Sequence, residues 1–279
     1  LLRQVLGSVA ISRLQIRLRK QEPRRGSHQL LKRAIRGRGQ IIQLSGEAGI
    51  GKSRLSAEVM ESAQDMGFRT LGGTSPSYGK TLAYATWKPI MRGLLDMSIR
   101  RSKDQEIQNA RQRLRDIDPA LVPRLPLLSP MLGIIIPDTE TTSGLEPDLR
   151  VQSLKSLILD VLLYQSARIP LAIVLEDCQW LDEPSKDLLQ FVGNNLADVP
   201  IALLIVYRTA DYAETLFPEI RLQNSSSIHL TPLGGQESEQ LATFKLRALR
   251  PTESIDVNDI ADIARKGQGN PFYLEELVN

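Results

Sequence analysis

The 279-residue sequence has a single cysteine, Cys178, and only two histidines, His28 and His229. One cysteine excludes an internal disulfide framework, and so few soft ligands exclude a structural zinc site. No apolar run approaches the roughly 20 residues needed to cross a bilayer, and the N-terminus lacks the apolar block of a secretion signal. We therefore expect a cytoplasmic protein that does not engage a membrane.

The sequence also lacks a strong excess of either positive or negative charge. The chain carries 35 basic and 32 acidic side chains, a net charge of +3, which describes a mixed surface and not a nucleic-acid footprint. The hydrophobic content of 42% is enough for a globular core. The sequence opens without a methionine and ends inside an apparent helix, so we expect it to be part of a longer polypeptide.

The stretch around which the sequence is organised is 46–53, which reads Gly-Glu-Ala-Gly-Ile-Gly-Lys-Ser and matches G-x-x-x-x-G-K-[ST]. The apolar run 41–44 before it predicts a buried strand, and apolar residues at helical spacing after it predict a helix that ends at Gly67. Glycines allow backbone N–H groups to turn inward around phosphates, and the helix N-terminus favours negative charge. In this loop Lys52 would contact the β- and γ-phosphates, and Ser53 would offer its hydroxyl to Mg²⁺.

A second stretch carries negative charge. The run Leu171–Leu175 predicts a central strand buried on both faces, and it ends in Glu176 and Asp177. Carboxylates at the carboxyl end of a buried strand are costly unless a cation lies there. We expect this strand to neighbour the phosphate-loop strand. Glu176 would then hold Mg²⁺ through water, and Asp177 would orient or deprotonate the water that attacks the γ-phosphate.

A third strand is predicted at 200–207, and Arg208 follows it. An arginine at a strand end could sense the γ-phosphate and stabilise transition-state charge, or it could form an ordinary surface ion pair. Trp180 is interpreted as a core residue. Asp182 is interpreted as the cap of a helix that begins near Pro184.

The remaining sequence suggests three regions: a basic N-terminal arm at 1–26, a core at 27–232 and a helical lid at 233–279. Within the core, the prolines between 118 and 147 predict an irregular insertion. The aromatic residues of 82–87 could stack a base, but we favour packing beneath a loop. The basic arm could contact nucleic acid or an anionic membrane, and we favour a solvated terminus.

Four stretches together resemble the ATPase module of the signal-transduction ATPases with numerous domains. They are Gly-Glu-Ala-Gly-Ile-Gly-Lys-Ser-Arg-Leu at 46–55, Val-Leu-Glu-Asp-Cys-Gln-Trp-Leu-Asp at 174–182, Tyr-Arg at 207–208 and Gly-Asn-Pro-Phe-Tyr-Leu-Glu-Glu-Leu at 269–277. The module is similar to those found beside class III adenylate/guanylate cyclase domains and in large LuxR-type transcription regulators. The resemblance covers about residues 29–278.

The resemblance implies ATP and Mg²⁺ as ligands, Glu176 and Asp177 as the acidic pair, Arg208 as a sensor, and Pro271 near the adenine. The residues expected to bind nucleotide are then Gly46, Glu47, Ala48, Gly49, Ile50, Gly51, Lys52, Ser53, Arg54 and Pro271. Those expected to act in catalysis are Lys52, Glu176, Asp177 and Arg208, with Ser53 and Glu176 at the metal.

We therefore predict an α/β P-loop NTPase, with a mainly parallel sheet flanked by helices and the start of a helical lid. It would bind Mg-ATP and hydrolyse it slowly, as a switch for other domains of the same polypeptide or for protein partners. A nucleotide-dependent oligomer is possible in such a module. The alternatives are a nucleotide-binding scaffold without turnover and a nucleic-acid-dependent ATPase.

Overall fold

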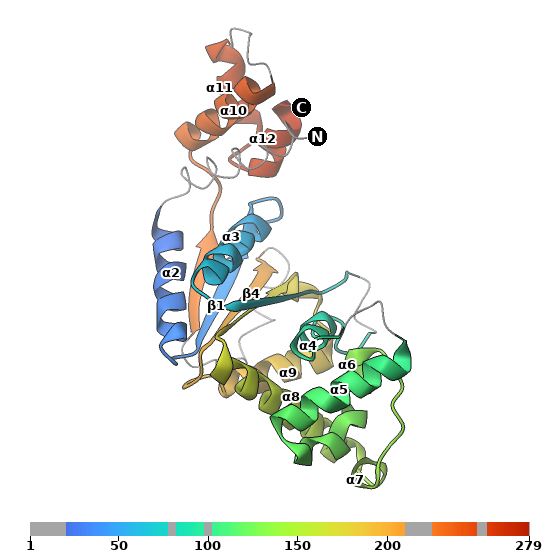
Figure 1. Cartoon of the computed structure of the whole chain (residues 1–279). Helices are drawn as coiled ribbons and strands as arrows, with labels where there is room; N and C mark the ends of the chain where they lie inside the picture. Colours follow the sequence, from blue (N-terminus) through green and yellow to red (C-terminus); the bar gives the residue numbers. More distant parts are fainter. Residues whose placement is uncertain (1–20, 78–81, 98–101, 210–224, 250–255, 279) are drawn as a thin grey trace.

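A parallel β-sheet forms the centre of the computed structural model, which describes residues 21–77, 82–97, 102–209, 225–249 and 256–278 (Figure 1). The strands run in the order β2-β3-β4-β1-β5. They are β1 (Gln40–Gly46), β2 (Arg69–Thr74), β3 (Leu171–Glu176), β4 (Ile201–Arg208) and β5 (Ser225–Leu230). Because each pair is parallel, the carboxyl ends of all of them lie at one edge of the sheet.

Helices connect the strands and cover the sheet. They are α2 (Gln21–Ile35), α3 (Lys52–Asp65), α4 (Lys88–Leu94), α5 (Lys103–Ile117), α6 (Ser129–Leu132), α7 (Glu140–Ser143), α8 (Pro147–Arg168), α9 (Glu183–Asn194), α10 (Gly235–Leu249), α11 (Val257–Lys266) and α12 (Pro271–Val278). Two 3-10 turns, η2 (Pro119–Leu128) and η3 (Cys178–Trp180), complete the described elements. The predicted α/β class with a mainly parallel sheet is confirmed.

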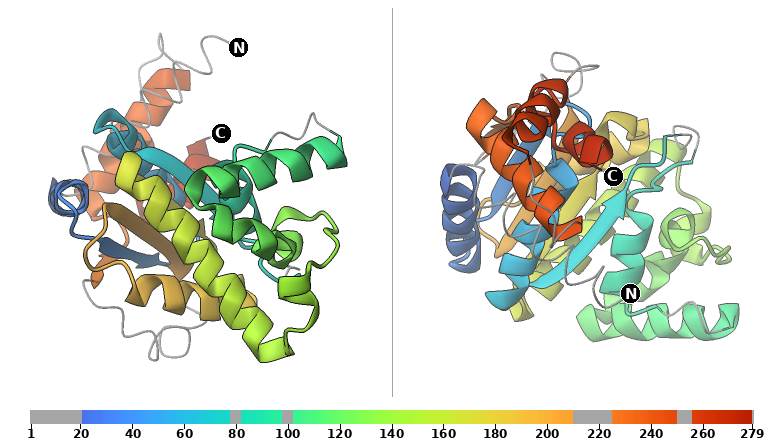
Figure 2. Two further views of the ribbon diagram at one scale, coloured as in Figure 1. Left: turned by 60° about the horizontal axis from the view of Figure 1, so that its bottom comes forward. Right: turned by 90° about the horizontal axis from the view of Figure 1, so that it is seen from above.

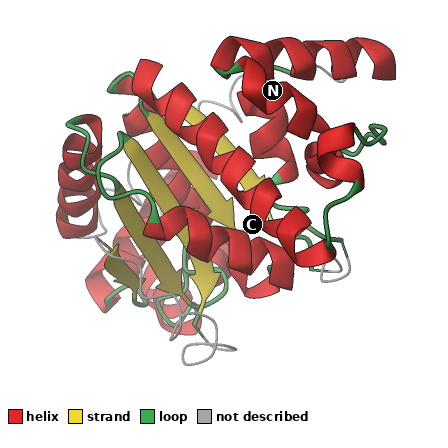
Figure 3. Cartoon of the chain, turned by 90° about the horizontal axis from the view of Figure 1, so that it is seen from below, coloured by secondary structure: helices red, strands yellow, loops and turns green. Residues whose placement is uncertain are grey.

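The three central strands β1, β3 and β4 are buried on both faces, as continuous apolar strands require. Successive residues of β1 point to opposite sides, so that Ile41 joins the larger apolar cluster while Ile42 and Leu44 join the smaller. Helices α2 and α3 cover the smaller cluster, and α4, α8 and α9 cover the larger. Figure 3 shows the strands between helices, and the left view of Figure 2 shows α8 crossing in front of them.

The order of the strands differs from the prediction in one respect. We expected the acidic pair on a strand next to the phosphate-loop strand, but β4 lies between β1 and β3. β1 pairs with β4 and β5, whereas β3 pairs with β2 and β4. Strand order depends on where each crossover connection places the next strand, and the pattern within a strand does not encode that path.

The predicted elements are present, with shifted ends. Helix α2 begins at Gln21, inside the predicted basic arm, since a proline in the first turn (Pro23) is compatible with a helix start. The rest of that arm, 1–20, lies outside the described residues. Helix α4 ends at Leu94, and a non-glycine residue with positive φ, Asp96 at 50°, follows soon after.

The region 118–147 forms only short helical pieces, as its prolines predict: η2, α6 and α7. It nevertheless contributes to the larger apolar cluster through residues such as Leu125, Leu128 and Met131. Together with α5 and α8 it builds a helical flank beside β2 and β3 (Figure 1). This flank is part of the main core and does not form a separate one.

Helices α10, α11 and α12, named here the C-terminal helices, follow β5 and stand beyond the end of the sheet (Figure 1). They have a small core of their own around Leu233, Leu241 and Leu274. Lys245 of α10 pairs with Glu275 of α12 at 3.1 Å, Nζ to Oε1. None of the helices in the described part of the chain is long and apolar enough to span a bilayer.

Candidate nucleotide-binding site

The loop between β1 and α3 has the backbone of an anion cradle. Gly49 and Gly51 have positive φ angles of 74° and 95°, which side-chain-bearing residues rarely adopt. A Cβ on Gly46 would lie 2.8 Å from the carbonyl oxygen of Leu230, so β5 leaves no room for one. Glu47, Ala48 and Gly49 are exposed at the tip, where a ligand can reach the loop.

The start of α3 is suited to a negative group. Gly51 occupies the N-cap, no side chain caps the helix among the residues described, and its first turn contains no acid. The first N–H groups of a helix have no partner within the helix, and its N-terminus carries partial positive charge. With neither a side-chain cap nor an acid in its first turn, the start of α3 can accept a phosphate.

Lys52 adds a full positive charge at the same point. Its Nζ donates to the carbonyl oxygens of Gly46 at 2.9 Å and Glu47 at 2.6 Å, and the residue is 8% exposed. The ammonium therefore lies on the inner side of the loop, where it can turn from the carbonyls to a bound phosphate. The next residue, Ser53, is exposed and presents its hydroxyl at the helix start.

The carboxylate of Glu176 lies close to this helix although its strand is not adjacent to β1. Its Oε1 accepts a hydrogen bond from Ser56, which is one turn after the phosphate loop. The Ser56 hydroxyl is also 2.9 Å from the main-chain oxygen of Ser53. The structure thus brings Glu176 and the predicted metal ligand Ser53 to one place.

Asp177 takes a left-handed backbone conformation with φ of 54°, which aspartate tolerates better than most residues. The chain turns sharply here from β3 into η3. Its Oδ1 accepts a hydrogen bond from Gln179 Nε2 at 3.0 Å. Cys178, directly after it, is fully buried, and burial raises the pKa of its thiol, so this cysteine is unsuited to act as a nucleophile.

The donor set fits a magnesium ion only together with a nucleotide. No group of three or more histidine, cysteine, aspartate or glutamate side chains gathers in the described residues, so the protein offers no cage of its own. Ser53 and Glu176 can supply a hydroxyl and a carboxylate. Mg²⁺ commonly binds through one or two such ligands, with phosphate oxygens and water in its other positions.

Arg208 lies at the end of β4, between the phosphate loop and the acidic pair. It is opposite Gly46 in the register of β4 with β1. Its guanidinium carbon is 5.1 Å from the centre of the Trp180 ring, within the range of a cation–π contact. The interpretation of Trp180 as a core residue is wrong: the ring is only partly buried and packs against Arg208.

The C-terminal helices contact the phosphate loop directly. Asn270 Nδ2 donates to the carbonyl oxygen of Ala48 at 2.9 Å, while its Oδ1 accepts from the N–H of Phe272 at 3.0 Å and so caps α12. A Cβ on Gly49 would lie 2.7 Å from Asn270 Oδ1, so this glycine permits the contact. The sequence prediction named Pro271, the buried first residue of α12, and missed Asn270.

An electrostatic interaction also links α3 to the C-terminal helices. Burial lowers the pKa of the Arg54 guanidinium, and the negative charges of Glu58 and Glu275 oppose that shift. Arg54 Nε lies 3.9 Å from Glu58 Oε1 within α3, whereas Glu275 belongs to α12. The residue that follows the phosphate-loop serine therefore interacts electrostatically with the C-terminal helices.

Asp182 has the structural role expected of it, and a further one. Its carboxylate accepts hydrogen bonds from the N–H of Ser185 at 2.9 Å, as a cap of α9, and from the N–H of Tyr84 at 3.0 Å. Tyr84 and Trp87 are buried, 6% and 0% exposed. The favoured interpretation of the 82–87 aromatics as packing residues is confirmed.

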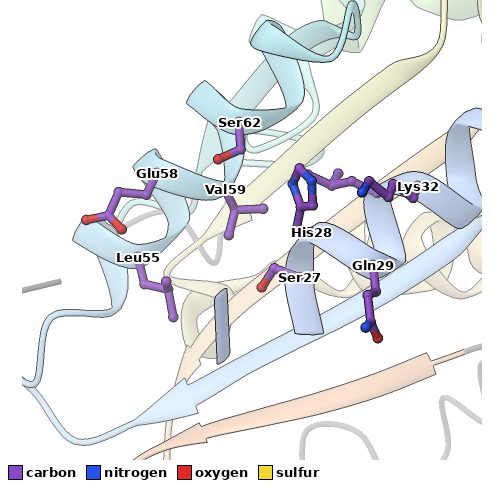
Figure 4. Close-up of a pocket in the computed structure, with 9 residues that line it drawn as sticks. Ser27, His28, Gln29, Lys32, Leu55, Glu58, Val59 and Ser62 are labelled. Carbon is purple, nitrogen blue, oxygen red and sulfur yellow. The ribbon is translucent and has the colours of Figure 1, made fainter. Parts of the chain in front are cut away.

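A cavity of about 500 Å³ lies between α2 and α3 and was not predicted from the sequence (Figure 4). It is lined by Ser27, His28, Gln29, Leu31, Lys32, Leu55, Glu58, Val59 and Ser62. Its volume is within the range of small-molecule sites. The lining comes from the mutually facing sides of two helices, which only their packing could reveal.

Comparison with known proteins places this site in a family. A sequence profile of the AAA ATPase domain matches residues 21–206. An uncharacterized protein of Rhizobium meliloti (strain 1021) is 26% identical over 262 residues, which are 89% of this chain and 23% of that protein. The chain thus spans less than a quarter of the length of this relative.

Two solved structures, each 13% identical, are similar to the chain. One is a signal transduction ATPase with numerous domains, with a tetratricopeptide repeat sensor, from Pyrococcus horikoshii; it has a TM-score of 0.41 and matches 86% of this chain and 27% of that one. The other is the ORC1 protein of Aeropyrum pernix in complex with DNA, with a TM-score of 0.47, 90% of this chain and 56% of that one.

The matched profile runs from the start of α2 to Val206 in β4 and so includes the phosphate loop, the acidic pair and most of the sheet. That confirms the resemblance drawn from the motifs. The chain belongs to the AAA ATPase domain family and is a nucleotide-binding ATPase module.

Proposed function

We propose that this chain binds Mg-ATP and hydrolyses it slowly, as a switch module within a multidomain signalling protein. The observation that carries the proposal is the convergence of three features at one edge of the sheet. The acid-free start of α3 offers a phosphate site, Lys52 lies on the loop, and Glu176 reaches Ser56 beside Ser53. A triphosphate with its cation satisfies all three charges at once.

Each side chain then has a defined task. Lys52 turns from the loop carbonyls to the β- and γ-phosphates. Ser53, and Glu176 through water, would hold Mg²⁺, which supplies neutralisation of the phosphate charge when bound. Asp177 orients the attacking water and accepts its proton, and Arg208 approaches the γ-phosphate and stabilises the charge that develops there.

In this proposal the C-terminal helices are the part of the module that changes position with the nucleotide. We propose that residues 233–279 form a lid over the core 27–232, with Pro271 near the adenine. The hydrogen bond from Asn270 to Ala48 and the charge interaction of Glu275 with Arg54 support this proposal. A lid that touches the loop can respond to a ligand only if the ligand interacts differently with its two positions, and a γ-phosphate held by the same loop provides that difference.

The signalling context is inferred from the motifs. We propose that the module acts beside an output domain, of the adenylate/guanylate cyclase or transcription-regulator type, in a longer polypeptide, with other domains or protein partners as its targets. A nucleotide-dependent oligomer fits such a module. The much greater length of the Rhizobium meliloti relative supports a multidomain setting.

The test is ATP binding and phosphate release by the purified chain, measured by calorimetry and by a phosphate assay. Lys52→Ala is expected to lower ATP affinity at least about tenfold, because it removes the ammonium that binds the phosphates. Lys186→Ala is the matched control, since Lys186 forms an exposed ion pair with Glu183 on α9.

The outcomes separate the possible functions. Binding without phosphate release would indicate a scaffold, and phosphate release that rises with added DNA or RNA and falls with salt would indicate a nucleic-acid-dependent ATPase. If Lys52→Ala alters neither binding nor hydrolysis, the proposed function is wrong.

A further inference from the structure

A buried glutamine lies between the acidic pair and the end of β4. Gln179 is 3% exposed and belongs to η3, two residues after Asp177. Its Nε2 donates to Asp177 Oδ1 at 3.0 Å, and its Oε1 accepts from the main-chain N–H of Arg208 at 3.2 Å. One amide group therefore contacts the acid at the end of β3 and the main chain at the end of β4.

The strand pairing shows why this contact is needed. The β3–β4 ladder ends with Leu175 opposite Ile205, whereas β4 continues to Arg208, opposite Gly46 of the phosphate loop. The N–H of Arg208 thus lies beyond the last residue of β4 that pairs with β3. Gln179 Oε1 provides the acceptor that the diverging strand no longer supplies.

The next residue contacts the side chain of the same arginine. The guanidinium carbon of Arg208 lies 5.1 Å from the centre of the Trp180 ring. Gln179 therefore fixes the main chain of Arg208, and Trp180 orients its side chain. On the other side of Arg208, the N–H of Thr209 donates to the carbonyl oxygen of Gly46 at 3.3 Å, so the connection extends to the phosphate loop.

We propose that Gln179 is a positioning residue for ATP hydrolysis: it holds the Asp177 carboxylate and Arg208 in a fixed relative position. The inference rests on the proposed function of the site. The role requires an amide, because the side chain must donate to a carboxylate on one side and accept from an N–H on the other. A thioether provides neither contact, and a carboxylate would repel Asp177.

The first test is Gln179→Met, which keeps the length of the side chain and removes both hydrogen bonds. We expect kcat to fall about 10- to 100-fold, the loss typical of a mispositioned reacting group. We expect the Kd for ATP to change less than about threefold, because the phosphate loop that binds the nucleotide is unaltered. The control is Gln165→Met on α8, which removes one hydrogen bond, to Leu94 O at 3.1 Å, and should retain kcat.

A second variant gives a readout that a merely structural role would not move. Gln179→Glu keeps an acceptor for the N–H of Arg208 but replaces the donor to Asp177 by a carboxylate oxygen, so that like charges face each other. We expect kcat to fall at least as far as in Gln179→Met, while the Kd for ATP stays within about threefold of the wild-type value, because the phosphate loop is unaltered. A loss of structure would instead weaken binding and hydrolysis together.

The results distinguish the two proposals. If Gln179→Met hydrolyses ATP at the wild-type rate, or loses kcat and affinity for ATP to the same extent, the positioning role is wrong and the ATPase function stands. If Gln179→Met does not fold, wild-type kcat in Gln179→Glu overturns the role. If the wild-type protein releases no phosphate, the proposed function fails and the positioning role fails with it.

Discussion

At the scale of single residues, the two neighbouring carboxylates have different surroundings. Glu176 contacts a hydroxyl of α3, next to the predicted metal ligand, whereas Asp177 leaves the strand in a left-handed conformation and contacts a buried amide. These contacts support the separate roles proposed for them, one at the cation and one at the attacking water.

The substitution Asp177→Asn tests the separate roles proposed for the two carboxylates. The amide is similar in size and cannot accept the proton of the water, so hydrolysis should fall at least about 100-fold, the lower bound for general base catalysis. ATP affinity should stay within about threefold, because the phosphates are held elsewhere. Single-turnover phosphate release and equilibrium binding measure the two quantities.

The control for this change is Asp160→Asn, since Asp160 forms a partly exposed ion pair with Arg124 on the helical flank. Normal hydrolysis by Asp177→Asn would show that this residue is not the base. A large loss of ATP affinity would instead assign Asp177 to ligand binding.

At the scale of elements, the phosphate loop and α12 meet through Asn270. This side chain caps its own helix with one atom and contacts the loop with another, and Gly49 leaves the space in which it lies. A helix cap of this kind is worth about 1 kcal/mol. The same residue can therefore be changed so that the helix cap remains and the contact with the loop is lost.

The substitution Asn270→Asp keeps the helix cap and removes the contact with the loop. The carboxylate still accepts from the N–H of Phe272, but it cannot donate to Ala48 and it places negative charge beside the phosphate site. We expect ATP affinity to fall about fivefold or more, since a net hydrogen bond alone is worth about 1 kcal/mol. Helix content should be unchanged. Calorimetry and far-UV circular dichroism measure the two.

Asn258→Asp is the matched control, because Asn258 is an exposed residue of α11. Equal ATP affinity in Asn270→Asp and this control would mean that the contact with the loop has no influence on nucleotide binding. The proposed lid would then lose its connection to the site.

At the scale of the whole molecule, the switch proposal predicts that the C-terminal helices change position with the nucleotide. The chain suits a distance measurement, since Cys178 is buried with a raised thiol pKa and should not react with a label. Ala57→Cys on α3 and Ala261→Cys on α11 place labels at two exposed positions. We expect different distance distributions with a slowly hydrolysed ATP analogue and with ADP.

The same spin-label distance measurement in the weaker-binding Lys52→Ala background, at a nucleotide concentration that saturates only the wild-type site, provides the control. Identical distributions for the two nucleotides would contradict the switch and leave binding and hydrolysis unaffected. The protein would then be an ATPase module with a fixed C-terminal part.

Much of the architecture could be predicted because it is encoded locally. Continuous apolar runs identified β1, β3 and β4, and Asp182 before Pro184 identified the start of α9. The phosphate loop was visible because its glycines and Lys52 are adjacent in the chain. Trp180 was interpreted incorrectly, since its partner Arg208 is 28 positions away in the sequence and nothing near the ring indicates it.

By itself, therefore, the sequence determined the parallel α/β elements, the anion-binding loop and the strand that ends in two acids, because each depends on neighbours along the chain. The tertiary structure alone decided that β4 separates the loop from the acids, that Gln179 joins their strand ends, and that Asn270 rests on the loop. Those contacts join residues up to 222 positions apart, and their formation depends on how crossovers and helices pack, which no local pattern records.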